Sequence, residues 1–375
     1  MSVNTNQITP DVQALLDYSG DHVTDLFATV VEKLNVERQR MQVILNLTAD
    51  TPLIKMTVGD GIRPYNGGEQ YESALVYSKR KIRIGSVKKE VLIDAKKYKR
   101  TWLSKYMRPG ANVEVPPFAE WTMSEIAKKF AAEINGNLLY KGRHEDDFVD
   151  FVAATVYPVG SLVKVVDTTG AGNDQFYIVL TETTSGDTPT SAAAKFSNIT
   201  KSAATDGFKI LIDELIADGF AQTTIGAINN TNVFALAAFR KLSRELDDAV
   251  WDDDTMNIVQ YCSLTDFQFL MDDIEDKISK YTVYDLETGL AVPNSMYLPG
   301  SNNKVIVQAV SWLSGSRRIV TTVEGNLAFG TNLMTDVNQI ATKANLWTLG
   351  VGMLFDFGVQ IADDSTKVLA FNDQA

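Results

Sequence analysis

The sequence predicts an α+β fold in two or three domains. Three observations predict it: a long helical pattern over 118–140, alternating helical and strand patterns over 206–278, and a period-two pattern over 349–361. The 375 residues, 45% hydrophobic and 22% charged, have the composition of a globular protein with enough chain for a sizeable core. No run of eighteen apolar residues and no signal-peptide pattern is present, so we expect no membrane-spanning segment.

The first 115 residues predict an arm followed by a long hairpin. Apolar residues between Val23 and Leu34 follow a helical spacing, which predicts a helical arm within residues 1–51. From Leu53 to Ile93 the pattern is extended and broken by glycines, and the run 79–84 has too few apolar residues to face a core. We therefore expect a hairpin that stands away from its own domain, with arms of about 15 residues and roughly 50 Å.

Basic charge is concentrated in this hairpin region. The chain has a net charge of −12, yet the segment from Lys79 to Arg108 contains twelve Lys/Arg against Glu90 and Asp94, a net charge of +10. The overall acidity disfavours a protein that binds nucleic acid broadly. Trp102 and Tyr106 within the basic segment are typical of a nucleic-acid patch or of an intersubunit contact, and the overall acidity favours the intersubunit contact.

The opposite charge gathers between Glu245 and Asp276, where eleven carboxylates occur without a Lys or Arg. A calcium site or a hydrolytic carboxylate pair is one interpretation, but the spacing lacks an EF-hand loop, and a solvated surface is favoured. If the run has a function, we expect it to receive the basic segment of a neighbouring subunit. The hypothesised contact residues are Lys79, Arg80, Lys81, Arg83, Lys88, Lys89, Asp252, Asp253, Asp254, Asp272 and Asp273.

The middle of the chain predicts a long helix and a small β-rich insertion. Ile126, Phe130, Ile134 and Leu138 recur every four residues after Pro116-Pro117, so the helix starts at Phe118 or at the capping-box pair Thr122 and Glu125. Between 144 and 205 the composition changes to Thr, Ser, Gly, Val and Tyr, with strand patterns at Ser161–Val166 and Gln175–Leu180. The intervening Gly170-x-Gly172 precedes a strand and is read as a hairpin turn, not a phosphate loop.

The remaining chain predicts an α/β segment and a terminal sheet. A helix from Asp206 to Gly219 precedes a strand at 224–228, a helix at 233–248, a strand at 257–262 and a helix opened by Thr265. In the terminal part the odd positions from Leu349 to Ile361 are apolar, which predicts a strand with one buried face.

The sequence contains few of the residues that most often act as nucleophiles, bases or metal ligands. The chain has two histidines, His22 and His144, and one cysteine, Cys262, which we expect to be a buried inert thiol. No nucleophile, base and orienting group are found together in the sequence. We therefore predict no enzyme activity, no catalytic or metal-binding residues and no cofactor.

The order of these parts resembles the major capsid proteins of tailed bacteriophages (Caudoviricetes), which have the Hong Kong 97-type shell fold. Local similarities are found at 207–215 (GFKILIDEL), 326–333 (NLAFGTNL) and 350–361 (GVGMLFDFGVQI). The resemblance covers essentially the whole chain. It implies an N-terminal arm at 1–51, an extended β-hairpin loop at 52–115, a spine helix of the peripheral domain at 116–143, an inserted β-subdomain at 144–205, an axial domain at 206–315, and a C-terminal sheet at 316–375 that returns to the peripheral and axial domains.

The resemblance also implies a function and partners. A major capsid protein self-assembles into pentamers and hexamers of an icosahedral shell, is assembled in the host cytoplasm, and encloses double-stranded DNA in the virion without sequence-specific binding. Scaffolding protein, portal and decoration proteins are the implied partners, and no membrane is involved. The insertion departs from the minimal family member, and the crosslinking known in some relatives would need roles such as Lys79 or Lys81 with Asn338 that no motif fixes.

Two alternatives remain open on the sequence. One is an encapsulin-like bacterial nanocompartment shell, which would enclose a cargo enzyme in place of a genome. The other, from a different class, is a carbohydrate-binding or carbohydrate-hydrolysing surface protein that uses the insertion and the acidic clusters.

Overall fold

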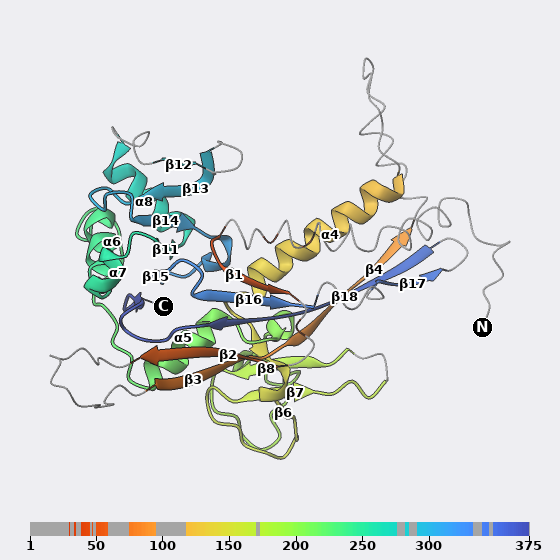
Figure 1. The fold of residues 1–375 in the computed structure, drawn as a ribbon. Coiled ribbons are helices and arrows are strands. Elements are labelled where there is room, and N and C mark those ends of the chain that lie inside the picture. Colours follow the sequence, from red (N-terminus) through yellow and green to blue (C-terminus); the bar gives the residue numbers. More distant parts are fainter. Residues whose placement is uncertain are drawn as a thin grey trace, which may run out of the picture.

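The computed structural model describes most of the chain between the N-terminal arm and the C terminus (Figure 1). The described residues are 30, 34, 39–45, 47, 50–58, 75–94, 118–169, 173–275, 282–284, 291–332, 340–344 and 348–374, with backbone only at 56–58, 75–79, 118–119, 340 and 344. They form an α+β fold with several separate sheets and a few helices, as predicted. None of the helices within these ranges is long and apolar enough to cross a membrane.

A long strand organises the first sheet. β18 (Thr348–Ile361) is the fourteen-residue strand predicted from its period-two pattern, and every odd position from Leu349 to Ile361 is buried. It pairs antiparallel with β4 along one edge and with β16 and β17 along the other, while β1 adds to β16 in parallel. The bounds of the partner strands are β1 Gln42–Leu45, β4 Gly85–Asp94, β16 Leu327–Thr331 and β17 Ile340–Ala344.

The buried face of this sheet packs against the long helix α4 (Phe118–Asn137). Phe130 of α4 meets Phe355 of β18 edge to face, with ring centroids 6.3 Å apart. The prediction of a long helix is confirmed. It begins at Phe118, one of the two starts that the sequence left open, so Thr122 lies inside the helix and is buried there instead of capping it.

A second sheet of six strands forms the α/β part. Its order is β12-β13-β14-β11-β15-β19, with β11 and β14 parallel. After β15 the chain enters the first sheet, where it forms β16 and β18. It then returns to the second sheet, because β19 pairs with β15. The bounds are β11 Ile258–Cys262, β12 Thr282–Tyr284, β13 Ala291–Tyr297, β14 Val305–Ala309, β15 Val320–Val323 and β19 Leu369–Phe371, with helices α5 Phe208–Ala217, α6 Ala235–Ser243, α7 Asp248–Asp252 and α8 Leu264–Asp273.

Three expectations for this part are wrong. Residues 224–228 form no strand, because the amides of Ile225 and Gly226 donate to the Asp373 carboxylate instead of entering a ladder. The helix expected at 233–248 already ends at Ser243 as α6, and the separate helix α7 begins only at Asp248. Helix α8 is capped by Ser263, whose Oγ accepts from the Asp266 amide, and not by Thr265.

The insertion is a small four-stranded sheet with a core of its own. Its order is β6-β7-β8-β9, and Tyr157, Val163, Val179 and Phe196 fill one side. The predicted strands at 161–166 and 175–180 are confirmed as an antiparallel pair. The bounds are β6 Val149–Asp150, β7 Leu162–Val165, β8 Gln175–Val179 and β9 Phe196–Asn198; the insertion is closed at its root by β5 (Arg143–His144) and β10 (Ala203–Ala204), which pair in parallel.

The basic segment is divided between a ribbon and the core. β2 (Thr51–Val58) and β3 (Leu75–Ile82) form a two-stranded antiparallel sheet, and β3 leads through Arg83 and Ile84 into β4. The expectation that the run 79–84 has too few apolar residues to face a core is wrong at Ile82, which is fully buried against Leu47 and Ala328. Val87 and Ile93 are buried against the first-sheet core because hydrophobic residues in β4 alternate with the charged ones.

Trp312 lies where the segment after α4, helix α5 and the second sheet meet. Its ring contacts Tyr140 after α4, Phe208 of α5 and Tyr261 of β11, with centroids 5.4 to 5.9 Å apart. The indole Nε1–H donates to the Gln39 Oε1 at 2.8 Å, so residue 39 of the N-terminal arm is anchored in the same cluster.

Candidate intersubunit surface

The β2–β3 ribbon is the candidate docking element. Its eight residue pairs run from Thr51↔Ile82 to Val58↔Leu75, and within the described part of the chain these two strands form a sheet of their own. Ile54 is 63% exposed on it. A two-stranded ribbon is marginal in water without a further packing surface. This geometry favours a role in docking.

The ribbon is nevertheless attached to its own body by apolar and polar contacts. Leu53 and Ile82 pack with Leu47 and Ala328. Lys55 forms an ion pair with Asp363, and Arg80 pairs with Asp364 at 3.3 Å. The Gln360 side-chain amide donates to the Lys81 carbonyl at 2.7 Å. The prediction of a hairpin that stands wholly away from its own domain is therefore wrong for the described arms, since both strands contact the loop after β18. Residues 59–74 between them lie outside the described residues.

Arg83 fixes the root where the ribbon leaves the first sheet. Its guanidinium donates to Asp147 Oδ1 at 3.0 Å and to Asp206 Oδ2 at 2.9 Å. Burial acts to lower the Arg83 pKa, but the hydrogen bond to Asp147 and the nearby carboxylates outweigh it, so its pKa is raised. The side chain of Thr205 donates to the Arg83 carbonyl at 3.2 Å. The insertion root and the start of α5 thus position the ribbon.

The remaining hypothesised cations are placed in different ways. Lys79 lies in β3, where only the backbone is described, and Lys81 is exposed. Lys88 projects from the outer face of β4 and lies 3.7 Å from Glu90, whereas Lys89 points inward and pairs with Glu133 of α4. Of the six basic residues proposed for a neighbour, four thus have carboxylate partners in their own chain: Arg80, Arg83, Lys88 and Lys89.

The five hypothesised carboxylates lie on the α/β part, where two of them accept hydrogen bonds within their own chain. Asp253 accepts hydrogen bonds from the Thr255 hydroxyl and amide, which lowers its pKa. Asp273 accepts from the Leu236 amide near the start of α6. Asp252, Asp254 and Asp272 are exposed. The carboxylates seen to pair with the hypothesised cations are instead Glu90, Glu133, Asp147, Asp206 and Asp364.

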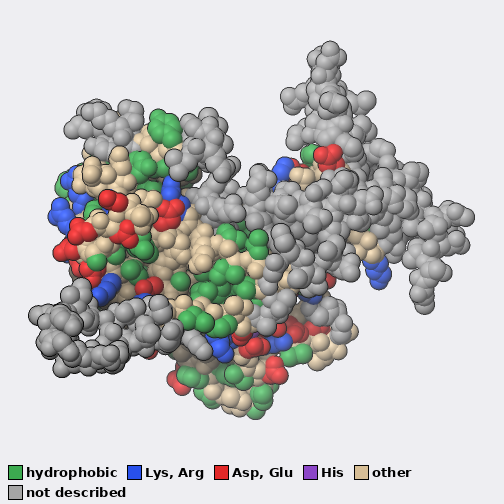
Figure 2. Space-filling model, viewed as in Figure 1, with side chains coloured by type: hydrophobic (Ala, Val, Ile, Leu, Met, Phe, Trp, Pro, Cys, Tyr) green, Lys and Arg blue, Asp and Glu red, His purple; other side chains and the backbone are tan. Residues whose placement is uncertain are grey.

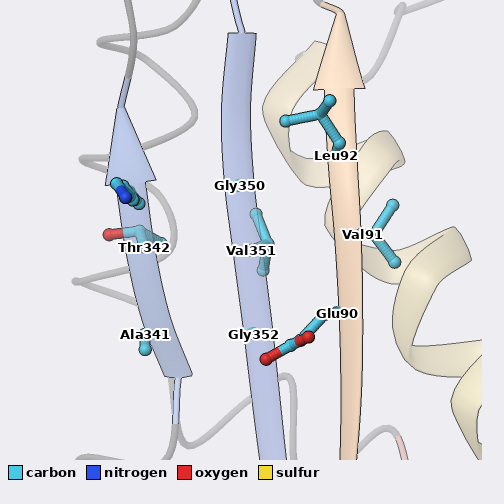
Figure 3. A pocket seen from close by; sticks show the side chains of 9 residues that line it. Glu90, Val91, Leu92, Ala341, Thr342, Gly350, Val351 and Gly352 are labelled. Atoms are coloured by element: carbon cyan, nitrogen blue, oxygen red, sulfur yellow. The ribbon is translucent and has the colours of Figure 1, made fainter. Parts of the chain in front are cut away.

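The outer face of the first sheet carries a shallow trough (Figure 3). Its floor is the backbone of Gly350 and Gly352 on β18, and its walls are Glu90 and Leu92 on one side and β17 on the other. Leu92 is 65% exposed, and Leu354 farther along the same face is 40% exposed. Sequence reasoning missed both leucines, although Leu92 falls on the outward phase of an alternating strand.

The titratable groups in the interior have structural roles. Cys262 is fully buried as predicted, and burial raises its pKa. His144 caps a short 3-10 helix, η2 (Glu145–Asp147), by accepting from the Asp146 amide through Nδ1. Asp266 pairs with Arg317 at 3.0 Å, and burial raises its pKa. No group of three metal-ligating side chains occurs among the residues that the structure describes, and His22 lies outside them.

Comparisons with known proteins give solved structures of viral and virus-like shells. The chain is similar to a chain of the satellite phage P4 procapsid (TM-score 0.47, 11% identity, 93% of this chain and 89% of that chain covered). It is also similar to the capsid of Myoviridae phage XM1 (TM-score 0.45, 11% identity, 90% of this chain and 91% of that chain covered). A third similar structure is a virus-like particle from Pyrococcus furiosus (TM-score 0.40, 7% identity, 92% of this chain and 96% of that chain covered). No family model and no curated protein matches the sequence.

Proposed function

We propose that this chain is the major capsid protein of a tailed phage, which self-assembles through its β2–β3 ribbon into a closed shell around double-stranded DNA. The observation that carries the proposal is the ribbon itself: two eight-residue strands are paired with each other, and Leu53 and Ile82 pack on the body while Ile54 is exposed. A ribbon of this kind gains stability by lying on another surface. In a closed assembly that surface belongs to a neighbouring copy.

Charge supports the same arrangement. Lys81 and Lys88 are exposed on the ribbon and on β4, and Lys79 lies in the same β3 strand. The exposed carboxylates Asp252 and Asp272 lie on the α/β part. We infer that the ribbon of one copy meets the acidic surface of the next, where opposite potentials would guide and align the two subunits.

The overall acidity fits a container for DNA. A net charge of −12 gives the chain little general affinity for phosphate, so enclosed DNA would move without adhering to the wall. In this proposal the shell has no catalytic role, and scaffolding and portal proteins are separate polypeptides.

Electron microscopy of the purified protein tests the proposal. We expect closed particles of uniform size when the chain is expressed alone or with a scaffolding protein from the same gene neighbourhood. Nuclease-resistant DNA in particles from infected cells would support the phage capsid. Particles that hold protein cargo and no DNA would instead indicate a nanocompartment shell, and a chain that stays monomeric under all these conditions would overturn the proposal.

A further inference from the structure

The insertion exposes several large apolar side chains. Val152, Val156, Val159 and Leu180 are between 49% and 64% exposed, although the insertion has a core that could have buried apolar residues. Figure 2 shows hydrophobic and acidic side chains side by side at the lower end of the molecule, where the insertion lies. We call Val152, Val156, Val159 and Leu180 the insertion patch. An exposed apolar patch of this kind marks an interaction surface.

Local packing holds the insertion patch in place. Between its valines the chain turns Tyr157 inward, where its ring stacks on Phe151 with centroids 5.7 Å apart. The Gly160 amide donates to the Val179 carbonyl at 2.8 Å, and the Thr183 amide donates to the Tyr157 carbonyl at 3.1 Å. These bonds hold the segment 157–160, which contains Val159, against the segment 179–183, which contains Leu180. This part of the patch is therefore fixed before a partner binds.

The surroundings of the patch are acidic. Residues 144–205 contain eight Asp or Glu and three Lys, a net charge of −5. Asp150 and Glu182 are exposed near the patch. Two of the three lysines are engaged, since Lys164 pairs with Asp174 at 2.9 Å and Lys195 pairs with Asp187 at 2.7 Å. A complementary partner would be apolar at its centre and basic around it.

One segment of the chain has that character. Residues 95–108 (AKKYKRTWLSKYMR) contain six Lys or Arg and no carboxylate, with Tyr98, Trp102 and Tyr106 spaced four apart. The segment 59–74 between β2 and β3 is a poorer match because it has three carboxylates and one arginine. A second insertion is also disfavoured, because two surfaces of net charge −5 repel one another.

We propose that the insertion patch binds residues 95–108 of a second copy of the chain. The apolar side chains of the patch would cover the aromatic residues, which combine a large contact area with few rotatable bonds, while the acidic surroundings would meet the six cations. The insertion would then act as an intersubunit clamp that is separate from the ribbon. This inference rests on the proposed shell function, because it requires assembled copies.

Disulfide trapping in assembled particles tests the proposal. The native chain has one cysteine, Cys262, which is fully buried. A disulfide between two engineered cysteines is therefore detected with little background from the native chain. Chains carrying Val159→Cys are co-assembled with chains carrying Ser104→Cys, oxidised mildly and separated on a non-reducing gel. Because a disulfide needs Cα atoms within about 7 Å, only a close approach is trapped. The matched control replaces Ser104→Cys with Ser73→Cys in the segment between β2 and β3.

We expect a severalfold stronger interchain band with Ser104→Cys than with Ser73→Cys, and a crosslinked peptide that joins residues 104 and 159 by mass spectrometry. Particles that form normally but crosslink through Ser73→Cys, through two copies of Val159→Cys, or not at all would overturn the clamp while leaving the shell function intact. Failure of the unmodified chain to form any particle would instead overturn the proposed function and the clamp with it. As a second measurement, Val156→Asp with Val159→Asp should lower particle stability without changing the circular dichroism of the unassembled chain.

Discussion

At the scale of single residues, Asp206 joins three parts of the chain. One carboxylate oxygen accepts from Arg83 at the ribbon root and the other from the His144 amide at the insertion root, while Asp206 itself precedes α5. It is buried, whereas Asp147, the other partner of Arg83, is more exposed. The two carboxylates therefore form a matched pair of test sites for the same arginine.

We expect Asp206→Ala to lower the free energy of unfolding by about 2 kcal/mol, because it leaves the buried His144 amide without its acceptor and removes a charged partner of Arg83. Asp147→Ala should cost about 1 kcal/mol or less, since its ion pair is partly exposed to water. Urea unfolding at pH 7 measures both. Equal losses for the two variants would contradict this assignment.

Asp187 in the insertion predicts a dependence of stability on acid. Hydrogen bonds from Lys195 and Thr184 lower the pKa of its carboxyl to about 2. A pKa that is lower in the folded state means that the contribution is complete above the unfolded value of about 3.9 and is lost as the pH falls through the folded value. We expect the Thr184 amide to exchange with solvent faster as the pH falls from about 4 to 2, after correction for intrinsic exchange.

Asp187→Asn is the control for this titration. It removes the ionisable group, so the variant should show faster exchange already at neutral pH and no additional acid-dependent opening at Thr184. If the variant follows the wild-type acid dependence, another group is responsible.

At the scale of elements, the glycines of β18 are of two kinds. A Cβ on Gly358 would lie 2.3 Å from the Arg83 carbonyl oxygen and 2.7 Å from Ile82, so the bare backbone is needed where the ribbon root crosses the strand. A Cβ on Gly350 would meet its nearest neighbour at 3.6 Å, an ordinary contact. Neither residue has a left-handed φ, so the difference is one of space alone.

Gly358→Ala should therefore lower the melting temperature strongly or prevent folding, because backbone atoms would have to shift. Gly350→Ala should leave the free energy of unfolding within about 1 kcal/mol of wild type, since a strand glycine replaced by alanine loses no contact. Thermal unfolding followed by circular dichroism compares them. Similar melting temperatures would show that β18 and the ribbon root are not tightly packed.

Elements with strong periodicity could be predicted from the sequence. Alternation over thirteen residues identified β18 and its buried face, and four-residue spacing identified α4. Each element buries one face along its whole length, so the apolar residues recur at a regular spacing within its own sequence. The insertion sheet could be predicted in outline for the same reason, since its central strands are separate apolar runs.

Features set by distant partners could not be predicted. The loop at 224–228 has a strand-like composition, but its amides bond to Asp373, which lies nearly 150 residues away in the chain. The partners of Arg80, Arg83 and Lys89 likewise come from Asp364, Asp206 and Glu133, and no local spacing relates them. Sequence reasoning therefore treated the whole basic segment as available to a neighbour, whereas four of its six hypothesised cations pair with carboxylates of their own chain.

At the scale of the whole molecule, the basic residues that stabilise the fold differ from those that are exposed for association. Arg83 and Lys89 bind carboxylates in the body, while Lys81 and Lys88 are exposed. Charges that hold the fold together are screened less by salt than charges that face solvent. The two pairs thus offer a direct test of whether exposed basic charge drives assembly.

We expect Lys81→Glu with Lys88→Glu to abolish particle formation while leaving the melting temperature of the unassembled chain within a few degrees of wild type, because exposed charges contribute little to stability. Arg83→Glu with Lys89→Glu should lower that melting temperature markedly, since it places carboxylates beside Asp147, Asp206 and Glu133. Combining the first pair with Asp252→Lys and Asp272→Lys should restore particles if these carboxylates receive the ribbon of the next subunit. Electron microscopy and calorimetry report the two properties separately. Normal particles from the Lys81→Glu, Lys88→Glu variant would show that association depends on apolar contacts such as those of Ile54 and Leu92, and not on the basic charge.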